Sequence, residues 1–115
     1  MSTLFRFLSF ILLVGVIAGF GRDASSQTFS TGSCDGTSSQ MLASNGVRRA
    51  ALIINDGTAT VWLKIGATAI ANEGIRLNAN GGSYYIALGA PNYDTEAVNC
   101  ISAGATIVIL LSEWS

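Results

Sequence analysis

The chain has 115 residues, a formal net charge of −1 and no histidine, and 50% of its residues are hydrophobic against 11% charged. This length allows one domain, and the low charge with high hydrophobicity argues against a disordered chain. Without histidine, histidine-based catalytic triads and histidine-coordinated metal sites are excluded, and a net charge near zero excludes the usual electrostatic route to nucleic-acid binding.

Residues 1–26 predict an export signal. The α-amino group and Arg6 give a positive start, and residues 7–20 form an apolar run interrupted only by Ser9. That run is shorter than the roughly 20 residues of a membrane-spanning helix, and small residues follow it before Gln27, as signal peptidase requires. We therefore expect cleavage after residue 26 and export to the periplasm, the extracellular medium or a virion surface. The alternative is a retained anchor, with the membrane reached only through residues 4–20.

Residues 27–115 form the second predicted unit, a series of short strands separated by glycine-containing turns. Periods of two and turn dipeptides place the strands at 27–33, 39–42, 48–55, 60–65, 75–77, 83–88, 96–102 and 105–114. No segment has the sustained period of 3.6 residues that marks a helix. The expected fold class is all-β: a single antiparallel sandwich, jelly-roll or immunoglobulin-like, or a small barrel, of about seven strands.

Cys34 and Cys100 both lie in this second unit. They form no CxxC pair and have no histidine to complete a zinc site, and no base is at hand to activate a nucleophilic thiol. In an exported chain such a pair predicts one disulfide that ties the start of the domain to its penultimate strand.

The last strand is apolar on both of its faces. A strand with one wet face should alternate, yet here three apolar side chains on one face oppose two on the other: Ile107, Ile109 and Leu111 against Val108 and Leu110. Either loops of the same chain or another subunit must cover the second face. The scarcity of charge favours a subunit, so these five residues are candidates for a homo-oligomer interface.

Two further groups are candidates for binding. Trp62, Tyr84, Tyr85 and Tyr93 could stack on a glycan or a peptide, or could pack in the core or at a subunit contact. Residues 89–95 combine Pro91 and Tyr93 with acidic neighbours, which suggests either a recognition loop or an ordinary solvated turn. Asp94 and Glu96 could hold Ca²⁺ or act as acid and base, but such pairs are common on solvated loops. No catalytic or cofactor motif is present, so no cofactor or metal is expected.

Several segments follow one another along residues 40–114 in a recurring order. They are RRAALIIN, VWLKIG, GIRL with a following GGS, and AVNCISA before a closing strand. This order resembles small β-domain proteins encoded among the virion genes of tailed phages. The resemblance implies a virion-surface or tail-associated structural role without catalysis. The signal-like segment and the cysteine pair depart from that pattern and indicate an exported relative.

Two functions are consistent with these observations. The first is a non-enzymatic structural or attachment protein that acts through self-assembly or contact with other virion or surface proteins. The second is a secreted bacterial binding module that recognises a glycan or peptide through an aromatic face.

Overall fold

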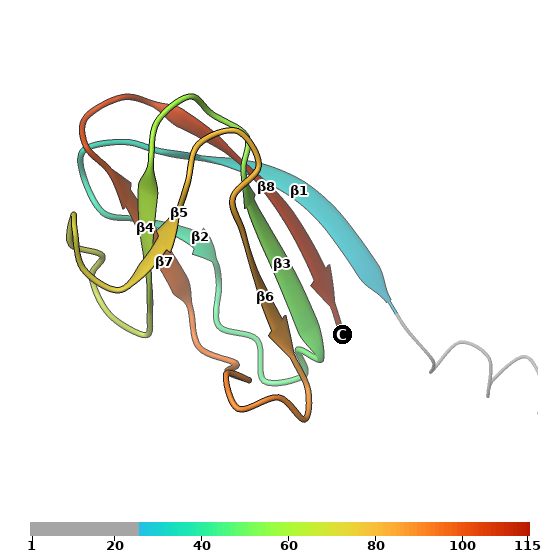
Figure 1. Ribbon diagram of the computed structural model, residues 1–115. Coiled ribbons are helices and arrows are strands. Elements are labelled where there is room, and N and C mark those ends of the chain that lie inside the picture. The colour runs from blue at the N-terminus through green and yellow to red at the C-terminus, as the bar shows by residue number, and fades with distance from the viewer. Residues whose placement is uncertain (1–25) are drawn as a thin grey trace, which may run out of the picture.

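The computed structural model describes residues 26–115, and they form eight strands and no helix (Figure 1). The strands are β1 (Gln27–Cys34), β2 (Ser39–Leu42), β3 (Ala50–Asn55), β4 (Val61–Ile65), β5 (Ile75–Leu77), β6 (Ser83–Ala87), β7 (Val98–Ser102) and β8 (Ile107–Trp114). Within this part of the chain, no helix is long and apolar enough to cross a membrane. Residues 1–25 of the predicted signal lie outside the described residues.

The strands form two four-stranded sheets, with the orders β1-β8-β3-β6 and β2-β7-β4-β5. Every pairing is antiparallel. Strands β1, β2, β3 and β4 pair in turn with β8, β7, β6 and β5, as the two arms of one long hairpin would. Rolling that hairpin across two sheets gives the jelly-roll order. The all-β prediction and the jelly-roll alternative within it are therefore confirmed, with eight strands in place of about seven.

The core lies between the two sheets and follows the period of two in the sequence. In β3, Ala51 and Ile53 point inward and are fully buried, while the alternate residues Leu52 and Ile54 stay partly exposed. In β4 the same alternation buries Val61 and Leu63, and β6, β7 and β8 add Ile86, Val98, Cys100, Ile107, Ile109 and Leu111. Successive side chains point to opposite faces of a strand, so this alternation fixes which face of each sheet is left outside.

Two buried polar side chains lie at one end of the sandwich. At the end of β3, the Asn55 amide donates hydrogen bonds to the carbonyls of Ala59 (2.8 Å) and Leu77 (3.1 Å), and its oxygen accepts the Gly57 amide (2.9 Å). At the end of β7, the Ser102 hydroxyl donates to the Ala105 carbonyl. A buried polar group costs little when it is fully hydrogen-bonded, so both residues stabilise the loops between sheets.

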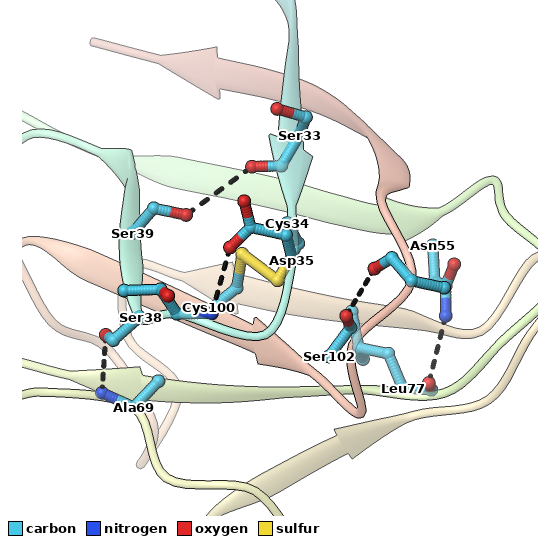
Figure 2. The surroundings of a disulfide bond; sticks show 12 residues. Ser33, Cys34, Asp35, Ser38, Ser39, Asn55, Ala69, Leu77, Cys100 and Ser102 are labelled. Carbon is cyan, nitrogen blue, oxygen red and sulfur yellow. Dashed lines mark hydrogen bonds between the residues drawn. A yellow bond between two sulfur atoms is a disulfide. The ribbon is translucent and has the colours of Figure 1, made fainter.

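A disulfide joins the sheets covalently, as the cysteine pattern predicted. Cys34 ends β1 in the first sheet, Cys100 lies in β7 of the second, and both are fully buried. Around the bridge, the Ser39 hydroxyl donates to the Ser33 carbonyl (3.5 Å) and the Ser102 amide donates to the Asp35 carbonyl (2.7 Å) (Figure 2). A disulfide of this kind indicates that the protein folds in an oxidising environment.

Candidate functional site

The outer face of the sheet β1-β8-β3-β6 is the most unusual surface of the described residues. The registers place its outward residues in rows across the four strands. One row holds Phe29, Ser112, Leu52 and Tyr85, and the next holds Thr31, Leu110, Ile54 and Ser83. Gln27, Trp114, Ala50 and Ala87 continue the face at one end, and Ser33 and Val108 at the other.

None of these outward residues is charged, and most are apolar. Phe29 is 72% exposed, Tyr85 53% and Val108 47%, which is unusual for large hydrophobic side chains. Apolar patches on the surface of a soluble protein often mark contact surfaces. We call these outward residues the uncharged face.

Two aromatic rings lie together on this face. Tyr85 of β6 and Trp114 of β8 have ring centroids 6.3 Å apart and meet edge to face. This is the preferred geometry for an aromatic pair, and it holds both rings in fixed orientations. The Tyr85 and Trp114 side chains therefore form an ordered aromatic pair where β6 and β8 meet the end of the uncharged face.

A groove runs over β8 between β1 and β3. It has a volume of about 420 Å³ and is lined by Phe29, Ser30, Thr31, Ile54, Leu110, Leu111 and Ser112. In the strand register the small Ser112 lies between Phe29 of β1 and Leu52 of β3. The groove offers apolar walls and a few hydroxyl groups, which suits an apolar side chain better than a charged ligand.

The outer face of the other sheet is different in composition. Trp62 lies there between Ile101 and Arg76, and Lys64 lies beside Asn99. Lys64 also approaches Glu73 at 3.7 Å, with both side chains well exposed. Such a mixture of charged, polar and apolar groups is an ordinary solvated surface.

The four aromatic residues proposed for ligand stacking do not share one surface. Tyr85 lies on the uncharged face, whereas Trp62 lies on the outside of the other sheet. Tyr84 and Tyr93 pack against the core, and the Tyr93 hydroxyl donates to the carbonyl of Arg48. The structure therefore leaves Tyr85 alone of the four on the uncharged face, with Trp114 as its neighbour.

Arg48 fixes the loop that was a candidate recognition element. Its guanidinium is fully buried and donates from Nε to Glu113 (2.6 Å), from Nη1 to the carbonyls of Asp94 (3.2 Å) and Glu96 (2.9 Å), and from Nη2 to the carbonyl of Ala43 (2.8 Å). A planar guanidinium with all these donors satisfied holds several chain segments at once.

Besides these hydrogen bonds from Arg48, residues 89–95 are held by hydrogen bonds of their own. Asp94 accepts the Glu96 amide through its own carboxylate (2.9 Å), and Asn92 donates to the Tyr85 carbonyl (2.8 Å). The loop thus uses its polar groups and Tyr93 to hold itself against the domain. No cluster of three or more potential metal ligands occurs in residues 26–115.

Of the five candidate interface residues in the last strand, the structure separates two from three. Ile107, Ile109 and Leu111 fill the core and are covered by the second sheet of the same chain. Val108 and Leu110 point outward on the uncharged face. The expectation that all five face a partner is corrected accordingly, because one face of β8 is covered within the chain.

The sequence reasoning missed part of the uncharged face. Phe29, Leu52, Ile54 and Trp114 belong to it but were not singled out. The signal was available in β3, where apolar residues occupy both sets of alternating positions, as they do in β8. Two such strands side by side indicate a sheet that is apolar on both faces.

Comparisons with known proteins give no family model, curated protein or solved structure that matches this chain.

Proposed function

We propose that this protein is a non-enzymatic structural or attachment protein, of the virion-associated kind that its sequence resembles, and that it works by protein contact through the uncharged face. The observation that carries the proposal is the row-by-row composition of that face, which is mostly apolar, free of charge across four strands, and exposes Phe29, Tyr85 and Val108. Burying it against another protein removes apolar surface from water without desolvating a single charge.

The contact we propose is first of all with further copies of this chain. A face without charges can meet its own copy without placing like charges opposite one another. The face extends roughly 25 Å along the strands and 19 Å across them, from the usual spacings in a sheet. That is about 500 Å² in plan, before the relief of the side chains is counted, and of the order of the surface that each partner buries in a standard interface.

The compartment and the fold agree with this role. The disulfide indicates an oxidising environment, and we propose export to the periplasm, the cell exterior or a virion surface. Jelly rolls serve as capsid and lectin domains, which is an analogy of fold and supports both a structural and an attachment role.

Leu110→Lys tests the proposal because Leu110 lies in the middle of the uncharged face. We expect the mass measured by light scattering at high micromolar concentration to fall while the thermal transition is retained. Ile101→Lys is the matched control, since Ile101 is an outward, partly exposed residue on a central strand of the other sheet. A wild-type protein that is already monomeric, or a folded Leu110→Lys variant of unchanged mass, would refute the proposal.

A second candidate function is recognition of a glycan or peptide by the aromatic corner of the same face. The edge-to-face pair of Tyr85 and Trp114 favours it, because two fixed rings give a firm stacking surface. Tyr85→Ala should then weaken binding to a glycan array at least tenfold, whereas Trp62→Ala, on the other sheet, should leave it unchanged. Absence of glycan or peptide binding by the wild-type protein removes this candidate.

A further inference from the structure

Four strands lie at the edges of the two sheets, and three of them are protected against pairing with another strand. β2 has four residues and a break in register between Gln40 and Leu42, and β5 has three residues with the exposed Arg76 in the middle. In β6 the carbonyl of Tyr85 is capped by the Asn92 side chain (2.8 Å). Short length, bulges, charges and covering groups are the usual means by which proteins block sheet edges.

β1 is the fourth edge strand and has none of these protections over most of its length. It runs for eight residues beside β8 without a break in register, and it contains no charge and no proline. Residues Gln27 to Thr31 are all exposed, and the strand forms the margin of its sheet in the described part of the chain (Figure 1). Such an edge is a ready template for a further strand.

The hydrogen-bond pattern shows which groups of β1 are free. The carbonyls of Val108 and Trp114 in β8 accept the amides of Asp56 (3.0 Å) and Arg49 (2.7 Å) from the β3 side, so the alternate residues Leu111 and Glu113 direct their backbone groups toward β1. Bonded pairs alternate with non-bonded pairs in an antiparallel ladder, so Thr28 and Ser30 direct their backbone groups toward β8. Gln27, Phe29, Thr31 and Ser33 therefore direct theirs away from the sheet, and the Ser33 carbonyl already accepts the Ser39 hydroxyl.

We propose that β1 pairs with β1 of a second copy of this chain, antiparallel, about a twofold axis that passes through Phe29. In this register Phe29 lies opposite Phe29 of the second copy, and Gln27 lies opposite Thr31 on both sides of the axis. These three pairs use the backbone amides and carbonyls that the β1–β8 ladder leaves free.

The side chains of β1 favour a second copy over another partner. Read outward from Phe29 in both directions, the strand presents a hydroxyl side chain and then an uncharged polar one: Ser30 and Thr31 on one side, Thr28 and Gln27 on the other. A strand with this near-palindromic pattern is complementary to itself in the antiparallel direction. Directly opposed residues interact across strands, and here an aromatic pair and two polar pairs form with no like charges opposed.

The pairing also joins the two uncharged faces. Directly opposed residues of an antiparallel pair lie on the same face, so Phe29, Gln27 and Thr31 of both copies stay on the outside. Two four-stranded sheets become one eight-stranded sheet with a single uncharged face of twice the area. This contact uses the edge of the sheet and not its face, so it goes beyond the proposed function and is tested separately.

Thr31→Pro tests the edge contact. Proline removes the Thr31 amide proton, which points away from the β1–β8 ladder, so an edge strand tolerates it while the added strand does not. We expect Thr31→Pro to lower the mass measured by light scattering twofold, and the double variant with Leu110→Lys to be monomeric. Leu110→Lys alone should remain a dimer. A folded Thr31→Pro variant of wild-type mass would overturn the edge contact and leave the proposed function intact.

Amide hydrogen exchange gives a second test on the unmodified protein. In a monomer the amides of Phe29 and Thr31 exchange fast while the Ser30 amide is protected by Leu111. In the paired form all three are protected, so protection at Phe29 and Thr31 should rise with protein concentration. Fast exchange at both residues at a protein concentration of about a millimolar would exclude the pairing, whether or not the proline variant folds.

Cross-linking tests the register itself. Bonded pairs have Cα atoms about 5.5 Å apart, within reach of a disulfide, so Phe29→Cys should form a covalent dimer on oxidation. Gln27→Cys is the matched control, because its copies would lie roughly 13 Å apart across the axis. Equal cross-linking of both variants would overturn the register, and a monomer whose β1 amides become protected only with an unrelated extended peptide would assign the edge to another partner.

Discussion

The two sheets have the same number of strands and share one core, yet they treat charge in opposite ways. The sheet β2-β7-β4-β5 carries Lys64 and Arg76 on its outer face, in contact with water. The sheet β1-β8-β3-β6 has an uncharged outer face. Its ion pair, between the buried Arg48 and Glu113, lies where β3 begins and β8 ends. The contrast shows that a low overall charge need not be spread evenly: here one face is left without any.

The same contrast separates solvation from contact. A face with charged residues is stable in water and resists association, because its charges must be desolvated when a partner covers them. A face without them has no such cost, and only its apolar area determines what it gains from burial. The uncharged face is therefore better suited to contact with another protein, and the charged face to contact with water.

The largest change expected in the described domain comes from separating the two sheets. The double variant Cys34→Ala with Cys100→Ala removes the disulfide between them. The bridged residues are 66 positions apart, and closing a loop of that length stabilises the folded state by about 4 kcal/mol in the chain-entropy model. Urea unfolding of the variant should show this loss together with a steeper slope, because the unfolded chain without the bridge is more expanded. A loss below about 1 kcal/mol would show that the sheets hold together without the bridge.

The next largest loss of stability is expected from removing the buried charge of Arg48. Arg48→Ala leaves the Glu113 carboxylate and three backbone carbonyls without their donor, and breaking a buried pair in this way costs about 3 kcal/mol. Arg49→Ala is the matched control, because the neighbouring residue is exposed and its loss should change the unfolding free energy by less than about 0.5 kcal/mol. Thermal unfolding of both variants compares a hidden charge with a displayed one. Equal effects would contradict the structural role of Arg48.

The smallest change is expected where charge is displayed on the second sheet. Lys64→Ala removes a pair with Glu73 that is 3.7 Å long and open to solvent on both sides. Exposed pairs contribute about 0 to 1 kcal/mol and are screened by salt, so the melting temperature should hardly move and self-association should be unaffected. A large fall in stability would mean that this face is less solvated than its composition suggests.

Much of the fold was predictable because strand and turn patterns are local. Alternation in residues 60–65 and the Asp56-Gly57 turn place β4 and the end of β3 correctly, since each depends on neighbouring residues only. The disulfide was predictable by elimination, because the chain has two cysteines and no partner for other thiol chemistry.

The remaining features depend on residues far apart in the sequence. That Arg48 grips residues 94–96 and Glu113 follows from the rolled hairpin, which brings both segments to the start of β3. The uncharged face likewise needs the neighbours of β8: Phe29 comes from one end of the chain and Tyr85 from a strand that pairs with β3. Local patterns indicate that β8 is apolar on both sides, but only the strand order shows which residues continue its outer face.

The pairing of β1 with β8 also determines how the domain would respond to a pulling force. Ser26 and Ser115 are hydrogen-bonded to each other, so the two ends leave the domain side by side. A force that separates these ends opens the β1–β8 ladder one pair at a time, and sequential opening of this kind resists weakly. When the opening along β1 reaches Cys34, tension passes through the disulfide to Cys100. The residues between the two cysteines, which are 66 positions apart, are then bypassed. Beyond that point β2 to β6 lie outside the loaded path, which runs from Cys100 in β7 to β8.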